Sequence, residues 1–152
     1  MRGHRVRGLV LAAVMVGATA CATAESTKPT ATPSLYKRLG GREGIALVVD
    51  DFVANAAADP RIKDRFAGLK PPEVFRLKSN LADLICDASG GPCSYLGKDM
   101  KTAHKGMNIT EAEWNATVEA LVKALDKHKV GERERRELLG LLGPMKADIV
   151  GQ

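Results

Sequence analysis

One histidine in the second half of the chain has the surroundings of a chemically active residue. His104 lies in the stretch GGPCSYLGKDMKTAHKGMNIT, residues 90–110, where the pattern predicts a short helix over Lys98–Lys105 between glycine-containing loops. A neutral imidazole is the commonest protein ligand for metal ions. A helix this short is marginal in water by itself. Something else must therefore hold it in place, and a bound cofactor is one candidate.

The same stretch resembles the heme-proximal segment of the group one truncated hemoglobins, in which a histidine on a very short helix ligates heme iron. The resemblance continues through SLYKRLGGREGIALVVDDFVANAAADPRI (34–62) and LLGPMKADIV (141–150), so it covers nearly the whole chain after residue 33. It implies an all-α truncated globin fold, a two-over-two helical sandwich around a heme pocket. It also implies His104 as the proximal iron ligand. Because no Cys-x-x-Cys precedes His104, the heme is expected to be b-type, iron protoporphyrin without thioether links.

The resemblance assigns further residues to this pocket. Phe66 matches a phenylalanine that packs on the heme plane, a role compatible with an ordinary core aromatic. Tyr95, Lys98 and Met100 match propionate-side and proximal-wall positions, although Tyr95 could equally be a loop tyrosine that covers the core. Lys98 stands where arginine is frequent, so its pairing with a propionate would be weaker and less bidentate.

The gas-binding side departs from the best-described members of the family. Those proteins carry a tyrosine in the first long helix and a glutamine in the next, which donate hydrogen bonds to dioxygen. Here Val53 stands at the tyrosine position, and Leu77 and Leu81 stand at the two positions of the next helix, which leaves Asn80 as the nearest polar residue. Because a neutral hydrogen bond is worth about 0.5–1.5 kcal/mol net, we expect faster oxygen release than in tyrosine-bearing relatives.

Residues 1–20 have the pattern of a secretory signal. Arginines at positions 2, 5 and 7 precede the apolar run LVLAAVMVGATA (9–20), which is too short to span a bilayer. Cys21 follows a small-residue triplet and resembles a lipobox cysteine, which favours a lipid anchor there; ordinary cleavage after Ala20 or Ala24 is the alternative. Residues 21–33, rich in Thr and Pro, are expected to be a flexible tether before the domain at 34–152. These features predict export to the periplasmic side of a bacterial membrane.

The near-balanced charge and the two cysteines of the domain further limit which classes of protein fit this sequence. Removing the three leader arginines from 23 basic side chains leaves 20 against 18 acidic ones, without a Lys/Arg cluster, which argues against nucleic-acid binding. Cys86 and Cys93 remain in the domain. A disulfide between them is favoured in an oxidising periplasm, and two free thiols are the alternative.

Apolar periodicity predicts helices throughout and no strand. The first long helix is expected between Gly40-Gly41 and Asp59-Pro60, and a short helical turn follows over Arg61–Phe66. A second long helix is expected from Pro71-Pro72 to Gly90, and a third after the capping box Thr110–Glu113. The last helix is expected from about Glu132, with a kink at Pro144. The other histidine of the domain, His128, is expected to be a solvated residue at the end of the third long helix.

The leading hypothesis is a heme protein that binds O2, NO or CO, with an unknown reductase as partner. The apolar gas-binding side offers no group to guide proton transfer, which argues against an enzyme. A side activity of the NO-dioxygenase type is the exception. Two alternatives stay open: heme trafficking or scavenging, and a heme-free helical envelope lipoprotein that acts as an interaction module. A visible spectrum separates the gas binder from the heme-free protein.

Overall fold

The computed structural model describes residues 32–152, and every regular element in this part of the chain is helical. The expected signal, Cys21 and most of the tether lie outside the described residues. The α-helices are α1 (Leu35–Arg38), α2 (Gly41–Ala58), α3 (Pro71–Ala88), α4 (Met100–His104), α5 (Glu111–Lys127) and α6 (Glu132–Leu142), and two 3-10 helices are η1 (Lys63–Arg65) and η2 (Gly143–Asp148). The predicted all-α class is confirmed.

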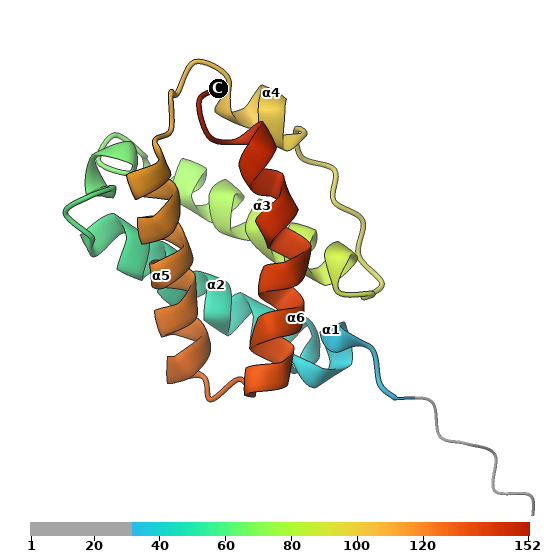
Figure 1. Ribbon diagram of the computed structural model, residues 1–152. Helices are drawn as coiled ribbons and strands as arrows, with labels where there is room; N and C mark the ends of the chain where they lie inside the picture. Colours follow the sequence, from blue (N-terminus) through green and yellow to red (C-terminus); the bar gives the residue numbers. More distant parts are fainter. Residues whose placement is uncertain (1–31) are drawn as a thin grey trace, which may run out of the picture. The chain divides into compact units, whose positions relative to one another are not determined.

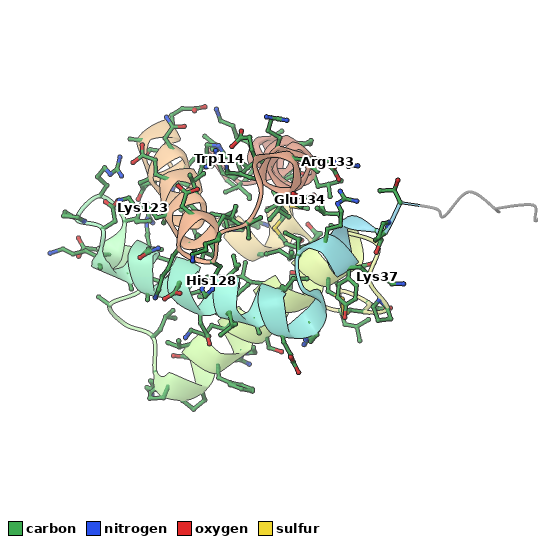
Figure 2. All side chains as sticks on the ribbon, turned by 90° about the horizontal axis from the view of Figure 1, so that it is seen from below. Lys37, Trp114, Lys123, His128, Arg133 and Glu134 are labelled. Atoms are coloured by element: carbon green, nitrogen blue, oxygen red, sulfur yellow. A yellow bond between two sulfur atoms is a disulfide. The ribbon has the colours of Figure 1, made fainter. Side chains whose placement is uncertain are left out.

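The long helices form two layers with α2 at their centre. α2 packs against α3 within one layer and against α5 of the other. Figure 1 shows α5 and α6 crossing in front of α2 and α3, and the turned view of Figure 2 separates the same layers. The buried core between them is almost wholly aliphatic, with α2, α5 and α6 supplying its largest fully buried side chains: Ile45, Val49, Leu125 and Leu138.

Local signals explain where the long helices begin and end. At the start of α3, Pro71 and Pro72 occupy the first turn, where proline is tolerated. At the start of α5, the Thr110 hydroxyl accepts from the Glu113 N–H at 3.2 Å, and the Glu113 carboxylate accepts from the Thr110 N–H at 2.8 Å. This reciprocal capping box is the one predicted. α2 ends before Asp59, as expected of a residue that precedes a proline.

The last helix differs from the prediction of one kinked helix. α6 ends at Leu142, and the chain then tightens into the 3-10 helix η2. Pro144 lies in the first turn of η2, where proline is tolerated. The prediction of one continuous α-helix through Pro144 is therefore wrong, because the chain changes helix type just before the proline. The kink itself stays a prediction.

Two smaller elements also differ from expectation. α4 is shorter than the predicted range because Asp99 caps it, its carboxylate accepting from the Thr102 N–H at 2.8 Å. α1 was not predicted, since four residues are too few to show a periodic pattern; Ser34 caps it, and it buries Leu35. Within residues 32–152, no helix combines the length and apolar character that crossing a bilayer requires.

Candidate functional site

Two apolar cavities meet at His104. The first, about 170 Å³, lies among α2, η1, α3 and α5. The second, about 460 Å³, extends from there towards α6 and η2. Six side chains line both: Phe52, Leu81, His104, Trp114, Thr117 and Ile149. Two adjoining apolar spaces of this size, with few polar groups, match the usual description of a small-molecule or cofactor site.

The His104 ring is held in one orientation by the first turn of its own helix. Its Nδ1 lies 2.8 Å from the backbone carbonyl oxygen of Met100, which can only accept, so Nδ1 carries the proton and donates. Nε2 has no hydrogen-bond partner among residues 32–152. A histidine held this way, with one nitrogen donating to a carbonyl, presents the lone pair of the other nitrogen to a metal ion.

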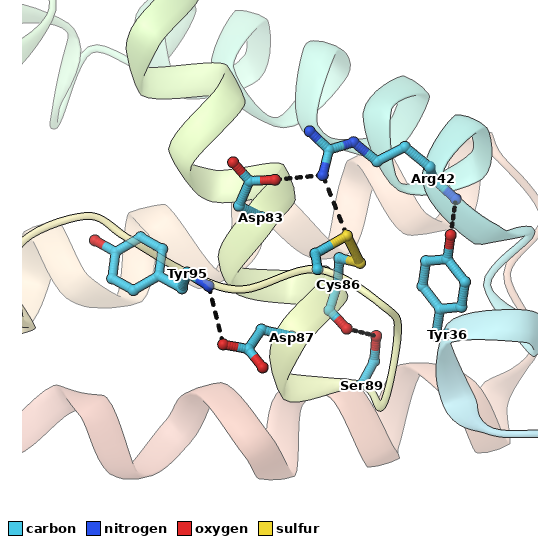
Figure 3. The surroundings of a disulfide bond; sticks show 8 residues. Tyr36, Arg42, Asp83, Cys86, Asp87, Ser89 and Tyr95 are labelled. Atoms are coloured by element: carbon cyan, nitrogen blue, oxygen red, sulfur yellow. Dashed lines mark hydrogen bonds and ion pairs between the residues drawn. A yellow bond between two sulfur atoms is a disulfide. The ribbon is translucent and has the colours of Figure 1, made fainter.

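The loop before α4 is tied to α3 at two points (Figure 3). The Cys86–Cys93 disulfide joins the last turn of α3 to this loop, which confirms the predicted bridge. Further along, the Tyr95 N–H donates to the Asp87 carboxylate at 3.0 Å. The Tyr95 hydroxyl then donates to the Lys98 carbonyl oxygen at 2.7 Å, directly before α4. These contacts fix the approach of α4, which is too short to hold itself in place.

The disulfide lies in a crowded corner. A Cβ on Gly91 would come within 2.6 Å of both the Cys86 Sγ and the Tyr36 ring, so only glycine fits between them. Arg42 Nη1 lies 3.3 Å from the Cys93 Sγ and pairs with Asp83 of α3 (Figure 3). Packing of α1, α2 and α3 therefore encloses the bridge on the side away from the loop.

The segment after His104 is held by the other end of the domain. Ile109 forms an isolated parallel bridge with Val150, and the Gly151 N–H donates to the Ile109 carbonyl oxygen at 2.9 Å. Arg65 of η1 donates to the Met107 carbonyl oxygen at 2.9 Å. α4 itself packs against η2. His104 thus owes its position to contacts with residues far away in the sequence.

A family model described as "Bacterial-like globin" matches residues 34–150. The chain belongs to this family of truncated globins. The group 1 truncated hemoglobin GlbN of Mycolicibacterium paratuberculosis is 32% identical over 116 residues, which cover 76% of this chain and 83% of that protein.

Solved structures show the same fold as this globin. The truncated hemoglobin from Tetrahymena pyriformis in its Fe(III) form gives a TM-score of 0.74 at 28% identity, covering 79% of this chain and 100% of that one. The 2/2 hemoglobin from a Synechococcus species, in the cyanomet state and with covalently attached heme, gives 0.71 at 26% identity, covering 78% and 98%. The truncated globin fold predicted from the sequence is confirmed.

The globin brings most of the predicted site residues to the cavities. Phe66, Val53, Leu77 and Leu81 line the first cavity together with His104, and Met100 lines the second.

Two predicted residues lie elsewhere. Tyr95 and Lys98 line neither cavity: the Tyr95 hydroxyl is engaged by the loop backbone, and the Lys98 side chain is exposed. The structure thus gives Tyr95 the loop role that the sequence left open, and it does not bring Lys98 to the pocket. Asn80, the nearest polar residue by sequence, also lines neither cavity.

Sequence reasoning missed several residues that line the cavities. Phe52 and Trp114 lie on the apolar stripes of their helices, and that spacing is the same for a core position and for a cavity wall. Thr117 follows Trp114 by one helical turn, but a hydroxyl does not register in an apolar pattern. Two cations also line the cavities, Arg65 the first and Lys146 the second.

His128 is more constrained than a solvated helix-end residue. It caps the C-terminus of α5 (Figure 2), and its side chain is only 23% exposed. Its Nε2 lies 2.6 Å from Asp51 of α2. Lys127 and His128 both bond to Asp51, and these bonds, the Lys127 one first, lower the pKa of the Asp51 carboxyl. The expectation of a freely solvated histidine is corrected: His128 joins the two layers.

An ion pair closes the first cavity on its η1 side. Arg65 Nε lies 2.7 Å from Glu113 Oε1, and this bond is the main reason why the pKa of Glu113 is lowered to about 2. The Thr110 N–H, which bonds to the same carboxylate, lowers that pKa further. Ionised Glu113 therefore joins η1 to the start of α5.

Glu113→Gln should lower the free energy of unfolding at pH 6 and weaken its pH dependence in acid. The glutamine can still accept from the Thr110 N–H, so the change removes mainly the charge. Because the folded pKa is about 2 and the ordinary value is 4.5, the stabilisation is present above pH 4.5 and is lost as the pH falls towards 2. Urea denaturation between pH 6 and pH 2.5 measures both effects.

Glu43→Gln is the control for this prediction. Glu43 is exposed and forms no ion pair within residues 32–152. Its variant should follow the wild-type pH profile, whereas an equal response of both variants would mean that the Arg65–Glu113 pair contributes nothing specific.

Proposed function

We propose that this globin binds one b-type heme between its two layers, with His104 Nε2 as the proximal iron ligand. One observation carries the proposal: two adjoining apolar cavities meet at a histidine whose Nδ1 is committed to the Met100 carbonyl oxygen. The fold supports it, since solved relatives are described in Fe(III) form or with attached heme. When bound, heme iron would supply a coordination position for a diatomic gas.

The side chains around the cavities fit the shape and polarity of this group. Phe52, Phe66 and Trp114 provide aromatic surface for a flat apolar ring system. Arg65 and Lys146 are the cationic side chains that line the cavities of the described domain, so they are suited to the heme carboxylates. Each is already paired with a glutamate, Arg65 with Glu113 and Lys146 with Glu111 at 2.6 Å. A carboxylate would therefore compete with these glutamates for its cation.

The proposed ligand is a diatomic gas, O2, NO or CO, held with little polar support from α2 and α3. Val53, Leu77 and Leu81 line the first cavity with hydrocarbon, and Asn80 lies outside it. Dioxygen gains more from a nearby donor than CO does, because it takes up more negative charge from the iron. The apolar walls therefore favour rapid oxygen release.

Val53→Tyr should slow oxygen release by roughly two- to tenfold, the equivalent of one neutral hydrogen bond. Val53 is buried on α2 and faces the cavity, so a tyrosine there places a phenolic donor in the apolar wall. Stopped-flow oxygen dissociation from the ferrous protein measures the effect, and CO dissociation should change much less.

Val53→Phe is the matched control, since it has the same ring without the hydroxyl. Equal oxygen release from the tyrosine and phenylalanine variants would show that bulk, and not hydrogen bonding, governs this wall.

The experiment that tests the function is the visible spectrum of the purified ferrous protein, with and without CO. The proposal expects one heme per chain and a spectrum that shifts on addition of CO. A chain that takes up no heme would support the heme-free interaction module instead. Rapid transfer of the heme to an apo-acceptor would support the trafficking alternative.

We also propose export and a lipid anchor at Cys21. The arginine-rich start, the apolar run and the small triplet before Cys21 support this. The Cys86–Cys93 disulfide is consistent with an oxidising compartment such as the periplasm. Mass spectrometry of the mature N-terminal peptide tests it: a peptide that begins at Cys21 and carries lipid supports the anchor, and an unmodified N-terminal peptide that begins at Cys21 or later excludes it.

A further inference from the structure

The cavity walls contain few side chains that could offer a hydrogen bond to a gas. Arg65 and Lys146 are engaged in ion pairs with Glu113 and Glu111. Apart from His104 and the Trp114 indole, this leaves one uncharged polar side chain along the cavities, Thr117 of α5, which lines both. Thr117 is half-buried, and its hydroxyl thus stands in surroundings that are otherwise hydrocarbon and aromatic.

The Thr117 hydroxyl has a partner that it can leave at low cost. Its Oγ1 donates to the Glu113 carbonyl oxygen at 2.8 Å, one turn earlier in α5. That carbonyl also accepts the regular i to i+4 backbone bond of the helix, so it stays satisfied when the hydroxyl turns away. A single rotation can therefore redirect the hydroxyl hydrogen towards the cavity, because hydroxyl hydrogens move freely about the C–O bond.

Thr117 also lies on a suitable wall for contact with a gas. α4, which carries His104, packs against η2, whereas α5 packs against α2, which carries Val53. Asn55 of α2 reinforces this second pair by donating to the Ala120 carbonyl oxygen at 3.2 Å. Thr117 thus belongs to the α2–α5 wall of the first cavity, together with Val53 and apart from the helix that supplies the histidine.

We propose that the Thr117 hydroxyl is the hydrogen-bond donor that retains dioxygen in preference to CO in this pocket. This inference rests on the proposed heme-based function and specifies which residue tunes its selectivity. Valine has nearly the same shape as threonine and would make this wall wholly apolar. A cavity that needed only apolar walls would therefore gain nothing from the threonine hydroxyl. It replaces donors that Val53, Leu77 and Leu81 cannot supply.

Thr117→Val and Thr117→Ser test the proposal in the full chain loaded with heme. Valine should speed oxygen dissociation by roughly two- to tenfold, the loss expected for one neutral hydrogen bond, and change CO dissociation less than about twofold. It should also raise the C–O stretching frequency in the infrared spectrum of the CO complex, because a donor near the oxygen weakens that bond. Serine, which keeps the hydroxyl, should resemble the wild type in both measurements.

Thermal unfolding of the heme-free chain separates this role from a structural one. Thr117→Val should melt at or slightly above the wild-type temperature, since its methyl group packs in an apolar wall and valine needs no hydrogen-bond partner. An unchanged oxygen rate and CO frequency in Thr117→Val would overturn the proposal and leave Thr117 as a back-bonded helix residue. Serine behaving like valine would overturn it as well. A wild-type chain that takes up no heme would instead refute the proposed function itself.

Discussion

Replacing His104 by glycine should abolish the proposed imidazole–iron bond, and free imidazole added to the solution should restore it. The Nδ1 bond to Met100 and the cavities on either side leave Nε2 as the ring's available ligand atom. Glycine removes the ligand and opens a space of the size of the ring. We expect a changed ferrous spectrum and at least a tenfold faster loss of heme to an apo-acceptor, because a second-shell contact alone is worth 10–100-fold in metal affinity and the ligand itself is worth more.

His128→Gln is the matched control for this experiment. His128 lies at the far end of α5 and bonds to Asp51, so its loss should weaken the α2–α5 packing without changing the spectrum. A His104→Gly protein with the wild-type ferrous spectrum and wild-type heme retention would refute the ligand assignment. Recovery of the spectrum with imidazole would exclude general misfolding as the cause of the loss.

Removing the disulfide should both lower the free energy of unfolding of the domain and speed its loss of heme. The bridge closes a loop between residues separated by 7 positions. For a loop of this length the chain-entropy model gives roughly 2–3 kcal/mol of stabilisation. The same loop leads directly into α4, so the double variant Cys86→Ser/Cys93→Ser should lose heme faster than the wild type. Urea denaturation and heme transfer to an apo-acceptor measure the two effects.

A reducing agent provides the control within the wild-type protein. Dithiothreitol should lower the wild-type stability towards that of the double variant and leave the variant unchanged. If the variant lost stability but kept the wild-type rate of heme loss, the disulfide would stabilise the end of α3 and have no part in positioning His104.

Local chemistry alone specified the end of α2 and the beginnings of α3 and α5. Prolines at 60, 71 and 72 and the capping box Thr110–Glu113 act on backbone groups no more than four residues away. Signals of this range can be found in a sequence without knowledge of its fold. The same holds for the segment around His104, since the shortness of its helix already indicated that an outside contact must support α4.

Contacts between distant segments decided the rest. The bond between Asp51 and His128 spans 77 positions, and the bridge between Ile109 and Val150 joins the segment after His104 to the end of the chain. Whether a side chain lines a cavity depends on how helices pack, and an apolar stripe looks the same against a core or a pocket. The sequence by itself therefore determined the positions of most helices and the resemblance to truncated hemoglobins. It also singled out His104 as the candidate iron ligand. Only the tertiary structure decided that Thr117 enters the pocket and that Lys98 does not, because packing and not spacing brings such groups together.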